Sequence, residues 1–304
     1  MELSKVVSGL EGRLISDGEF DDLNYCTAET DRSFLTFIEK EKFIAKMNPM
    51  VTCVLCSDGL VDKLPSFVKG IFVTDEPKFY FHQIYHMVGG SNEKTVRKVE
   101  IGPDCEISPL AYIADTNVVI GRNVIIEPFA IVNENVSIGD DCIIHSNVVL
   151  GGRSFSPARH RKSGETCCLD DRGQVYLEHD VEICCGTHVA QGIWPTDVTI
   201  IGAHSKIDVH CHIGHGAKIG KSVFIAAGAI IGGNTEIGDN AWVGINATVS
   251  NRLKVGADTR VSLGSVVTKD VGDGVTVTGN FAIEHAKFLW YLKNVVLGGL
   301  NRRV

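Results

Sequence analysis

Residues 201–220 read IGAHSKIDVHCHIGHGAKIG, and an aliphatic residue stands at every sixth position in this stretch and beyond it. An α-helix needs a period near 3.6 and a flat strand a period of 2, so the pattern is a repeat and neither element alone. The aliphatic positions are Ile201, Ile207, Ile213, Ile219, Ile225, Ile231, Ile237, Val243, Val249, Val255, Val261 and Val267.

The hexads predict a three-sided coil in which each hexad forms one side and places its aliphatic residue inside. Three hexads close one coil, so residues eighteen apart stack on coils about 4.8 Å apart. A second set of mostly small residues, four places after each aliphatic, shares the narrow interior. These are Ser205, Cys211, Ala217, Val223, Ala229, Thr235, Ala241 and Ala247. The fold class predicted is a mainly β, parallel β-solenoid.

The repeat extends upstream to Ile101, with one inserted residue before Ile120 and an excursion of 26 residues at 151–176. Pro195 occupies one aliphatic slot, and because the phase continues to Ile201 we expect the loop 192–199 to leave the register unchanged. About eight coils result.

Outside the repeat, residues 1–98 predict a small α/β domain, with strands at 13–15, 33–38, 51–56 and 70–73 and helices at 39–47 and 77–88. Residues 89–92 predict its exit linker. Residues 99–275 form the coil domain with loop 151–176. Residues 276–304 predict a strand and a helix that caps the last coil.

Composition excludes several classes of protein. For this chain of 304 residues, a net charge of −8 and a pI near 5.8 argue against nucleic acid as the main partner, which would require a basic face. We expect no secretion signal, no membrane span and a cytoplasmic location. The ten cysteines are then expected to be reduced.

Stacking also predicts a polar column. Counting in eighteens places His179, Asp197, His215, Gly233 and Asn251 above one another, with Arg252 beside the last. Such a column, interrupted by a glycine, is typical of a cleft between packed prisms. His215 faces outward in His212-Ile213-Gly214-His215-Gly216 and is the strongest candidate for a functional residue.

Residues 176–220 resemble the UDP-3-O-acylglucosamine N-acyltransferases of lipid A synthesis. The resemblance lies in Asp180-Val181-Glu182-Ile183, Gln191-Gly192, the Asp197 loop, Lys206-Ile207-Asp208 and Ile213-Gly214-His215. The repeat also resembles that of the wider hexapeptide-repeat sugar N-acyltransferases, whose fold is a left-handed β-helix. These include enzymes acting on nucleotide-linked 4-amino-4,6-dideoxy sugars.

The resemblance implies acyl transfer from a thioester to a sugar amine. It assigns the general base to His215, the carboxylate that orients it to Asp208, and an oxyanion-binding N–H to Gly233. A histidine with a pKa near 6.5 suits the first role and a backbone amide suits the last. Substrate contacts are expected from Phe34 and Phe43, which match aromatics that hold uracil, and from Glu182, Gln191 and Asp197.

The departures from the family indicate the donor. Arg252 stands where the lipid A enzymes have a second histidine. The family's Gly-Phe-Gly-Phe loop is replaced by a basic segment at 153–162. Phosphates of coenzyme A or of a sugar-linked diphosphate would suit this cluster. Residues 277–282 resemble the strand that ends many coenzyme A-dependent members. The expected cofactor contacts are Arg153, Arg159, Arg161, Lys162, Asn251 and Arg252.

Four readings stay open. The first is an acyl-CoA-dependent N-acyltransferase on a dTDP- or UDP-linked 4-amino-4,6-dideoxyhexose, without a metal. The second is the lipid A enzyme, with acyl carrier protein as donor. The third is a zinc carbonic anhydrase using His179, His210 and His215. The fourth is a silent scaffold. For the enzymes we expect a homotrimer with sites between subunits.

Overall fold

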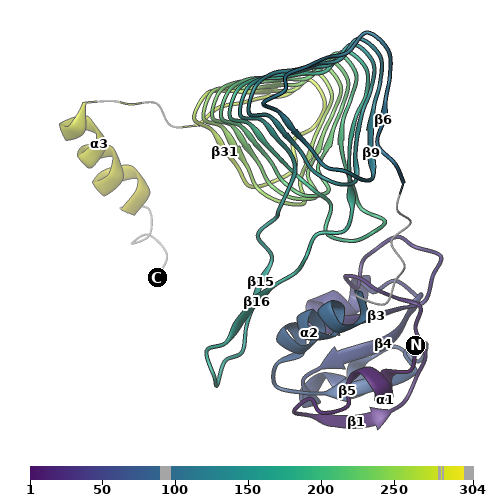
Figure 1. The fold of residues 1–304 in the computed structure, drawn as a ribbon. Coiled ribbons are helices and arrows are strands. Elements are labelled where there is room, and N and C mark those ends of the chain that lie inside the picture. The colour runs from purple at the N-terminus through teal and green to yellow at the C-terminus, as the bar shows by residue number, and fades with distance from the viewer. Residues whose placement is uncertain (90–96, 280–281, 283, 298–304) are drawn as a thin grey trace. The chain divides into compact units, whose positions relative to one another are not determined.

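The computed structural model describes residues 1–89, 97–279, 282 and 284–297 (Figure 1). The chain divides into two compact units. The N-terminal unit comprises residues 1–98, 153–174 and 191–197, and the coil unit comprises 99–152, 175–190 and 198–304. Most of the 151–176 excursion therefore belongs to the N-terminal unit and not to the coils, where we had placed it.

The N-terminal unit is built on a five-stranded sheet in the order β1-β5-β4-β3-β2, in which only the β1–β5 pair is antiparallel. The four predicted strands are present, whereas the expected helix at 39–47 is a short 3₁₀ segment. Residues 90–92 of the expected linker lie outside the described part. The elements are α1 (Leu3–Val6), β1 (Arg13–Ser16), β2 (Asp22–Leu23), β3 (Phe34–Ile38), η1 (Glu41–Lys46), β4 (Val51–Cys56), η2 (Asp58–Lys63), β5 (Gly70–Val73) and α2 (Pro77–Gly89).

Two segments remote in sequence complete the core of this unit. The excursion forms an antiparallel hairpin of β15 (Pro157–Arg159) and β16 (Thr166–Cys168). The loop 191–197 contributes Trp194, whose buried ring meets the rings of Tyr25, Phe81 and Tyr85 edge-on. The loop that interrupts the repeat is thus held by aromatic packing on α2.

The coil unit has three parallel sheets, which form the sides of a prism (Figure 1). Within the described residues the first sheet contains β7 (Glu106–Ile107), β10 (Ile125–Ile126), β13 (Ile143–Ile144), β18 (Glu182–Ile183), β21 (Lys206–Ile207), β24 (Phe224–Ile225), β27 (Trp242–Val243), β30 (Arg260–Val261) and β32 (Thr276–Val277). The second contains β8 (Tyr112–Ile113), β11 (Ile131–Val132), β14 (Val149–Gly152), β19 (His188–Ala190), β22 (His212–Ile213), β25 (Ile230–Ile231), β28 (Thr248–Val249) and β31 (Val266–Val267). The third contains β6 (Glu100–Ile101), β9 (Val118–Ile120), β12 (Val136–Ile138), β17 (Gln174–Leu177), β20 (Val198–Ile201), β23 (Lys218–Ile219), β26 (Glu236–Ile237) and β29 (Lys254–Val255).

The predicted interior is confirmed. The aliphatic residues from Ile201 to Val267 are all buried, and the small residues at the second set of positions are at most 2% exposed, whereas Ile101 in the first coil is 52% exposed. Many turns between sheets use a residue with positive φ, most often Asn or Asp, such as Asn240 at 58° and Asp258 at 54°. These two side chains tolerate that conformation best among non-glycine residues. The repeat therefore encodes both the sides and the turns.

The register differs from the expectation at one place. Ile207 pairs with Ile225, eighteen residues on, but Ile183 pairs with Ile207, 24 residues on. The six additional residues lie within the loop 191–197, which leaves the coil, and Pro195 in it is exposed. Our expectation that this loop keeps the eighteen-residue register is therefore wrong, because a hexad can be looped out without changing the phase of the pattern.

The described part of the C-terminal tail ends in α3 (His285–Tyr291) and a π-helical segment (Leu292–Leu297). No side chain of α3 is buried, and Phe288 and Trp290 are 45% and 64% exposed. The helix therefore buries no apolar face as the expected cap would. Asn280 and Phe281, which belong to the strand resemblance, lie outside the described residues. No described helix is long and apolar enough to cross a bilayer.

Two neighbouring isoleucines test the inside and outside of the coil. Ile231 is fully buried and Ile230 is 45% exposed on the same strand. We predict that Ile231→Ala lowers the free energy of unfolding by about 2 to 4 kcal/mol through the cavity it leaves. Ile230→Ala should cost less than about 1 kcal/mol. Urea unfolding followed by circular dichroism measures both, and equal losses would contradict the assignment of the interior.

Candidate active site

His215 lies at the turn between the second and third sheets, which we call the second corner. Residues 213, 231 and 249 pair in register along the second sheet, so Gly233 and Asn251 follow His215 in one column as predicted. A Cβ added to Gly233 would lie only 2.4 Å from His215 Nε2. The imidazole therefore rests directly on this glycine, and any side chain there would displace it.

The backbone around Gly233 is arranged for this contact. Its carbonyl accepts from the Arg252 N–H at 2.9 Å, and the neighbouring Asn234 N–H donates to His215 O at 2.7 Å. Within the described residues, the Gly233 N–H has no hydrogen-bond acceptor. The amide is thus available to a ligand beside the imidazole.

Sequence reasoning missed two further histidines near this corner. His188 and His212 occupy paired positions on β19 and β22, and their rings stack at 5.2 Å. His188 Nε2 lies over Gly152 as His215 does over Gly233. The two histidines are 24 residues apart because of the looped-out hexad, so counting in eighteens cannot pair them.

Burial makes His215 a weaker base than expected. It lowers the pKa of His215 to about 4, and the charges of Arg252 and His212 add to the effect. Burial likewise lowers the pKa of His188 and His212. The expected value near 6.5 is therefore wrong for the single chain. Because the unfolded chain binds this proton more readily, the stability that neutral His215 contributes is present above pH 6.5 and is lost as the pH falls toward 4.

Asp208 does not orient His215 within one chain. It lies at the first corner, between the first and second sheets, where its carboxylate accepts from the N–H groups of Val209 at 2.8 Å and Ala227 at 3.1 Å. His215 Nδ1 is buried without a hydrogen-bond partner among the described residues. Because no carboxylate among those residues accepts from His215 Nδ1, nothing offsets the effect of burial on the pKa of His215.

The lower members of the predicted column are misplaced by the looped-out hexad. His179 lies at the third corner, between the third and first sheets, where its ring meets that of His204 at 4.8 Å. Asp197 belongs to the N-terminal unit and closes its own loop, with Oδ2 accepting from the Trp194 N–H at 3.4 Å. Neither residue stacks below His215.

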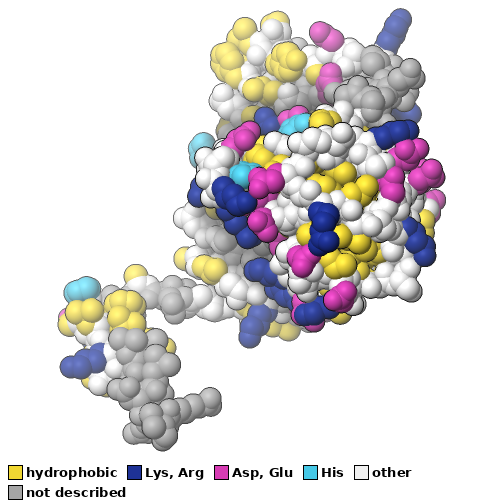
Figure 2. Space-filling view, turned by 90° about the horizontal axis from the view of Figure 1, so that it is seen from below, with side chains coloured by type: hydrophobic (Ala, Val, Ile, Leu, Met, Phe, Trp, Pro, Cys, Tyr) yellow, Lys and Arg dark blue, Asp and Glu magenta, His cyan; other side chains and the backbone are white. Residues whose placement is uncertain are grey.

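The basic segment 153–162 is neutralised by acids of the N-terminal unit. Arg153 pairs with Asp170 at 2.6 Å. The other two pairings are Arg161 with Glu39 and Glu76, and Lys162 with Glu11 and Asp75. Figure 2 shows side chains of both signs interspersed on the face in view. The structure therefore gives no support to the expected phosphate-binding cluster, because three of its four basic side chains already pair with carboxylates. Arg159 is exposed and has no ion pair among the described residues.

The predicted substrate contacts in the N-terminal unit are mostly structural. Phe34 is fully buried in the core and cannot stack on a base. Phe43 is half-buried, with Lys42 Nζ 5.2 Å from its ring centre. Gln191 is buried, and its Nε2 donates to Gly173 O at 2.5 Å.

The structure does not align the three histidines of the carbonic anhydrase hypothesis. His179, His210 and His215 lie at three different corners of the prism, and no described group of metal-ligating side chains contains all three. The hypothesis rested on the five-residue spacing of His210 and His215 and on the expected stacking of His179 two coils below His215, and the looped-out hexad removes that stacking.

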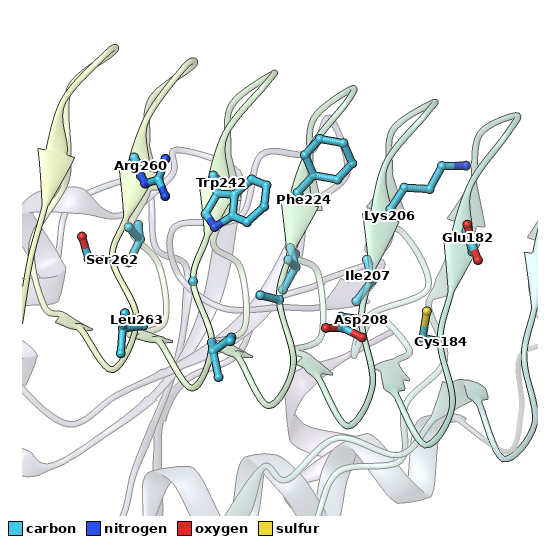
Figure 3. A pocket seen from close by; sticks show the side chains of 15 residues that line it. Glu182, Cys184, Lys206, Ile207, Asp208, Phe224, Trp242, Arg260, Ser262 and Leu263 are labelled. Carbon is cyan, nitrogen blue, oxygen red and sulfur yellow. The ribbon is translucent and has the colours of Figure 1, made fainter.

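A groove of about 770 Å³ runs along the first sheet and the first corner. Figure 3 shows Lys206, Phe224, Trp242 and Arg260 on consecutive strands, with Glu182 and Cys184 at one end. Phe224 and Trp242 are nearly half exposed and meet edge-on at 5.6 Å, and Arg260 lies over Trp242. His215 does not line this groove.

These features define the class of the chain: its coil unit is a parallel β-solenoid of hexapeptide repeats. Residues 117–152 match the family described as bacterial transferase hexapeptide (six repeats). Among solved structures, the UDP-N-acetylglucosamine acyltransferase from Campylobacter jejuni aligns with a TM-score of 0.52 at 22% identity, covering 67% of this chain and 77% of that one. The coil unit therefore has the hexapeptide-repeat β-helix fold.

Two curated relatives carry the same name. The UDP-3-O-acylglucosamine N-acyltransferase of Polynucleobacter asymbioticus is 34% identical over 119 residues, which cover 38% of this chain and 33% of that protein. The one from Coxiella burnetii is 26% identical over 219 residues, which cover 62% and 60%. The chain spans about a quarter to three fifths of the length of the curated relatives it matches.

The electrostatic coupling of His215 to Arg252 can be measured directly. Arg252→Gln removes a neighbouring positive charge, so the pKa of His215 should rise from about 4 toward 6.5. Two-dimensional NMR of the imidazole nitrogens follows the titration, with His215→Gln to assign the signal. Arg260→Gln on the first sheet is the matched control and should leave the titration unchanged. An unaltered His215 titration in the Arg252 variant would contradict the coupling.

Proposed function

We propose that this chain transfers an acyl group from a thioester to the amine of a nucleotide-linked sugar. The observation that carries the proposal is the His215 imidazole resting on Gly233, with the glycine N–H left without an acceptor among the described residues. The curated relatives named UDP-3-O-acylglucosamine N-acyltransferase support the reaction class.

The chemistry needs a base and an oxyanion donor side by side. Neutral His215 accepts a proton from the attacking amine as the C–N bond forms, and the Gly233 N–H stabilises the negative oxygen of the tetrahedral intermediate. The C–S bond then breaks and the thiolate leaves. A base with a pKa near 4 is neutral throughout the physiological range, so it is ready to accept at pH 7.

For the donor and acceptor we propose acyl-CoA and a dTDP- or UDP-linked 4-amino-4,6-dideoxyhexose. Arg252 in the His215 column supports a phosphate-bearing ligand at this corner. The neutralised basic segment does not add to that support. The alternative is an acyl carrier protein donor and UDP-3-O-acylglucosamine, and the names of the curated relatives favour it.

Two substitutions test the reacting pair. His215→Ala should lower kcat/KM by about 10²- to 10⁴-fold, since general-base assistance has that size. Gly233→Ala should lower it by at least about 100-fold, because its Cβ would meet the imidazole. Gly272→Ala is the matched control, since its Cβ meets nothing closer than 3.9 Å. Full activity in both His215 and Gly233 variants would refute the assignment.

Paired assays separate the two donors. Each nucleotide sugar is incubated with an acyl-CoA or with an acylated carrier protein, and product masses are read by mass spectrometry. We expect the N-acylated 4-amino sugar from acyl-CoA. Turnover only with a long-chain acyl carrier protein and UDP-3-O-acylglucosamine would establish the alternative.

We also propose that the site is shared between subunits of a homotrimer. Asp208 and the groove lie at the first corner of the prism, whereas His215 lies at the second. One chain therefore does not bring its base to its own groove, and an adjacent copy can. Sedimentation velocity should give three times the chain mass of 33.0 kDa. A stable, active monomer would overturn the shared site.

A further inference from the structure

The first corner holds a second cluster of reactive side chains that the proposed reaction does not use. Pairing in the first sheet aligns Ile126, Ile144 and Ile183, so the residues that follow them stack: Glu127, His145 and Cys184. Glu182 projects from β18 beside them. All four are half-buried.

His145 is fixed between two carboxylates. Its Nδ1 lies 3.0 Å from Glu127 Oε1, and its Nε2 lies 2.9 Å from Glu182 Oε1. Glu127 is held in turn by the Ser146 N–H at 2.9 Å and the Ser146 hydroxyl at 3.1 Å. The imidazole thus has one well-anchored carboxylate on Nδ1 and a more freely placed one on Nε2.

The thiol of Cys184 lies near His145 and Glu182. Ligand atoms of His145, Glu182 and Cys184 all lie within 4.8 Å of one another. Imidazole, thiolate and carboxylate are the three donors that zinc takes in proteins. A histidine that ligates a metal almost always donates its other N–H to a carboxylate or carbonyl, and Glu127 is placed for that role.

We propose that this corner binds one Zn²⁺ through His145 Nε2, a Glu182 carboxylate oxygen and Cys184 Sγ, with Glu127 orienting the imidazole. The site does not depend on the proposed acyl transfer, and it departs from our expectation of a chain without metal.

The distances permit the site with small movements. Tetrahedral zinc with bonds of 2.0 to 2.3 Å separates its ligand atoms by about 3.3 to 3.8 Å. The His145–Glu182 pair must open by roughly 0.4 Å, and the sulfur must close by up to about 1 Å. Backbone positions need not change, because the movements lie within the reach of side-chain rotation.

Two of the three proposed ligands line the groove. Glu182 and Cys184 both line the 770 Å³ groove, and Figure 3 shows them at its end beside Lys206. Lys206 Nζ is engaged by the Asp180 carboxylate at 2.9 Å and its carbonyl at 3.0 Å. A three-ligand zinc with one open position can hold water or a ligand from the groove.

A rival donor set shares the same imidazole. Glu127, His145 and Cys185 also lie within 4.8 Å of one another. In that set Glu127 would ligate through Oε1, the oxygen beside His145 Nδ1, and the imidazole N–H would stay on Glu182. Glu182 and Cys184 line the groove whereas Glu127 and Cys185 do not, so a ligand can reach a metal held by the first set, and we assign the metal to Cys184.

The experiment uses the full chain, reduced and stripped of metal by chelation. Co²⁺ is added as a spectroscopic probe, since a cobalt–thiolate bond gives a strong near-ultraviolet charge-transfer band, and Zn²⁺ affinity is measured by competition. We expect one equivalent per chain with the band present. Cys184→Ser should abolish the band and weaken Zn²⁺ at least about 100-fold, and Glu127→Gln should weaken it about 10- to 100-fold with the band retained.

The matched control is Cys168→Ser, which alters one of the other vicinal cysteine pair, in the N-terminal unit, and should leave band and affinity unchanged. Circular dichroism verifies the fold of each variant. Absence of a stoichiometric cobalt–thiolate band in the unmodified chain overturns the proposal without any variant. Loss of the band in Cys185→Ser but not in Cys184→Ser overturns the ligand set.

Discussion

The structure depends on the hydrogen bonding of each coil to the next. Each strand pairs through backbone hydrogen bonds with the strand of the next coil. A residue therefore lies over the residue eighteen positions away and not over its sequence neighbours. This constraint converts spacing in the chain into proximity in space. The contact of His215 with Gly233 follows from it, as does the stacking of Glu127, His145 and Cys184.

The same constraint explains which parts of the site could be predicted from the sequence. Above Ile207 no hexad is looped out, so counting in eighteens predicts the His215, Gly233 and Asn251 column correctly. Below it, six additional residues within the loop 191–197 leave the coil while preserving the phase of the pattern. Periodicity alone cannot show this, because inserting one whole repeat of six residues leaves the spacing of the aliphatic residues unchanged. The packing of Trp194 in the N-terminal unit was the missing information.

Charge could be predicted less well than position. A run of arginine and lysine at 153–162 predicts a phosphate site, yet it pairs with Asp170 of the same excursion and with Glu76 and Glu11 from distant parts of the sequence. The pKa of His215 is likewise lowered by burial, which depends on the turns above and below it. Both effects arise from tertiary surroundings, which a spacing rule does not contain.

The groups expected in one active site lie at two different corners of the prism. The second corner supplies an imidazole and an unpaired amide, while the first supplies an apolar groove with a His, Cys and carboxylate cluster at its end. The second sheet separates them within one chain, so neither corner is complete alone. The proposed homotrimer requires a neighbour's first corner to lie beside His215. The carboxylate that would then pair with His215 Nδ1, which has no partner within the described chain, is that of Asp208. In that arrangement the second subunit acts on the base through the nitrogen that is unpaired in the isolated chain.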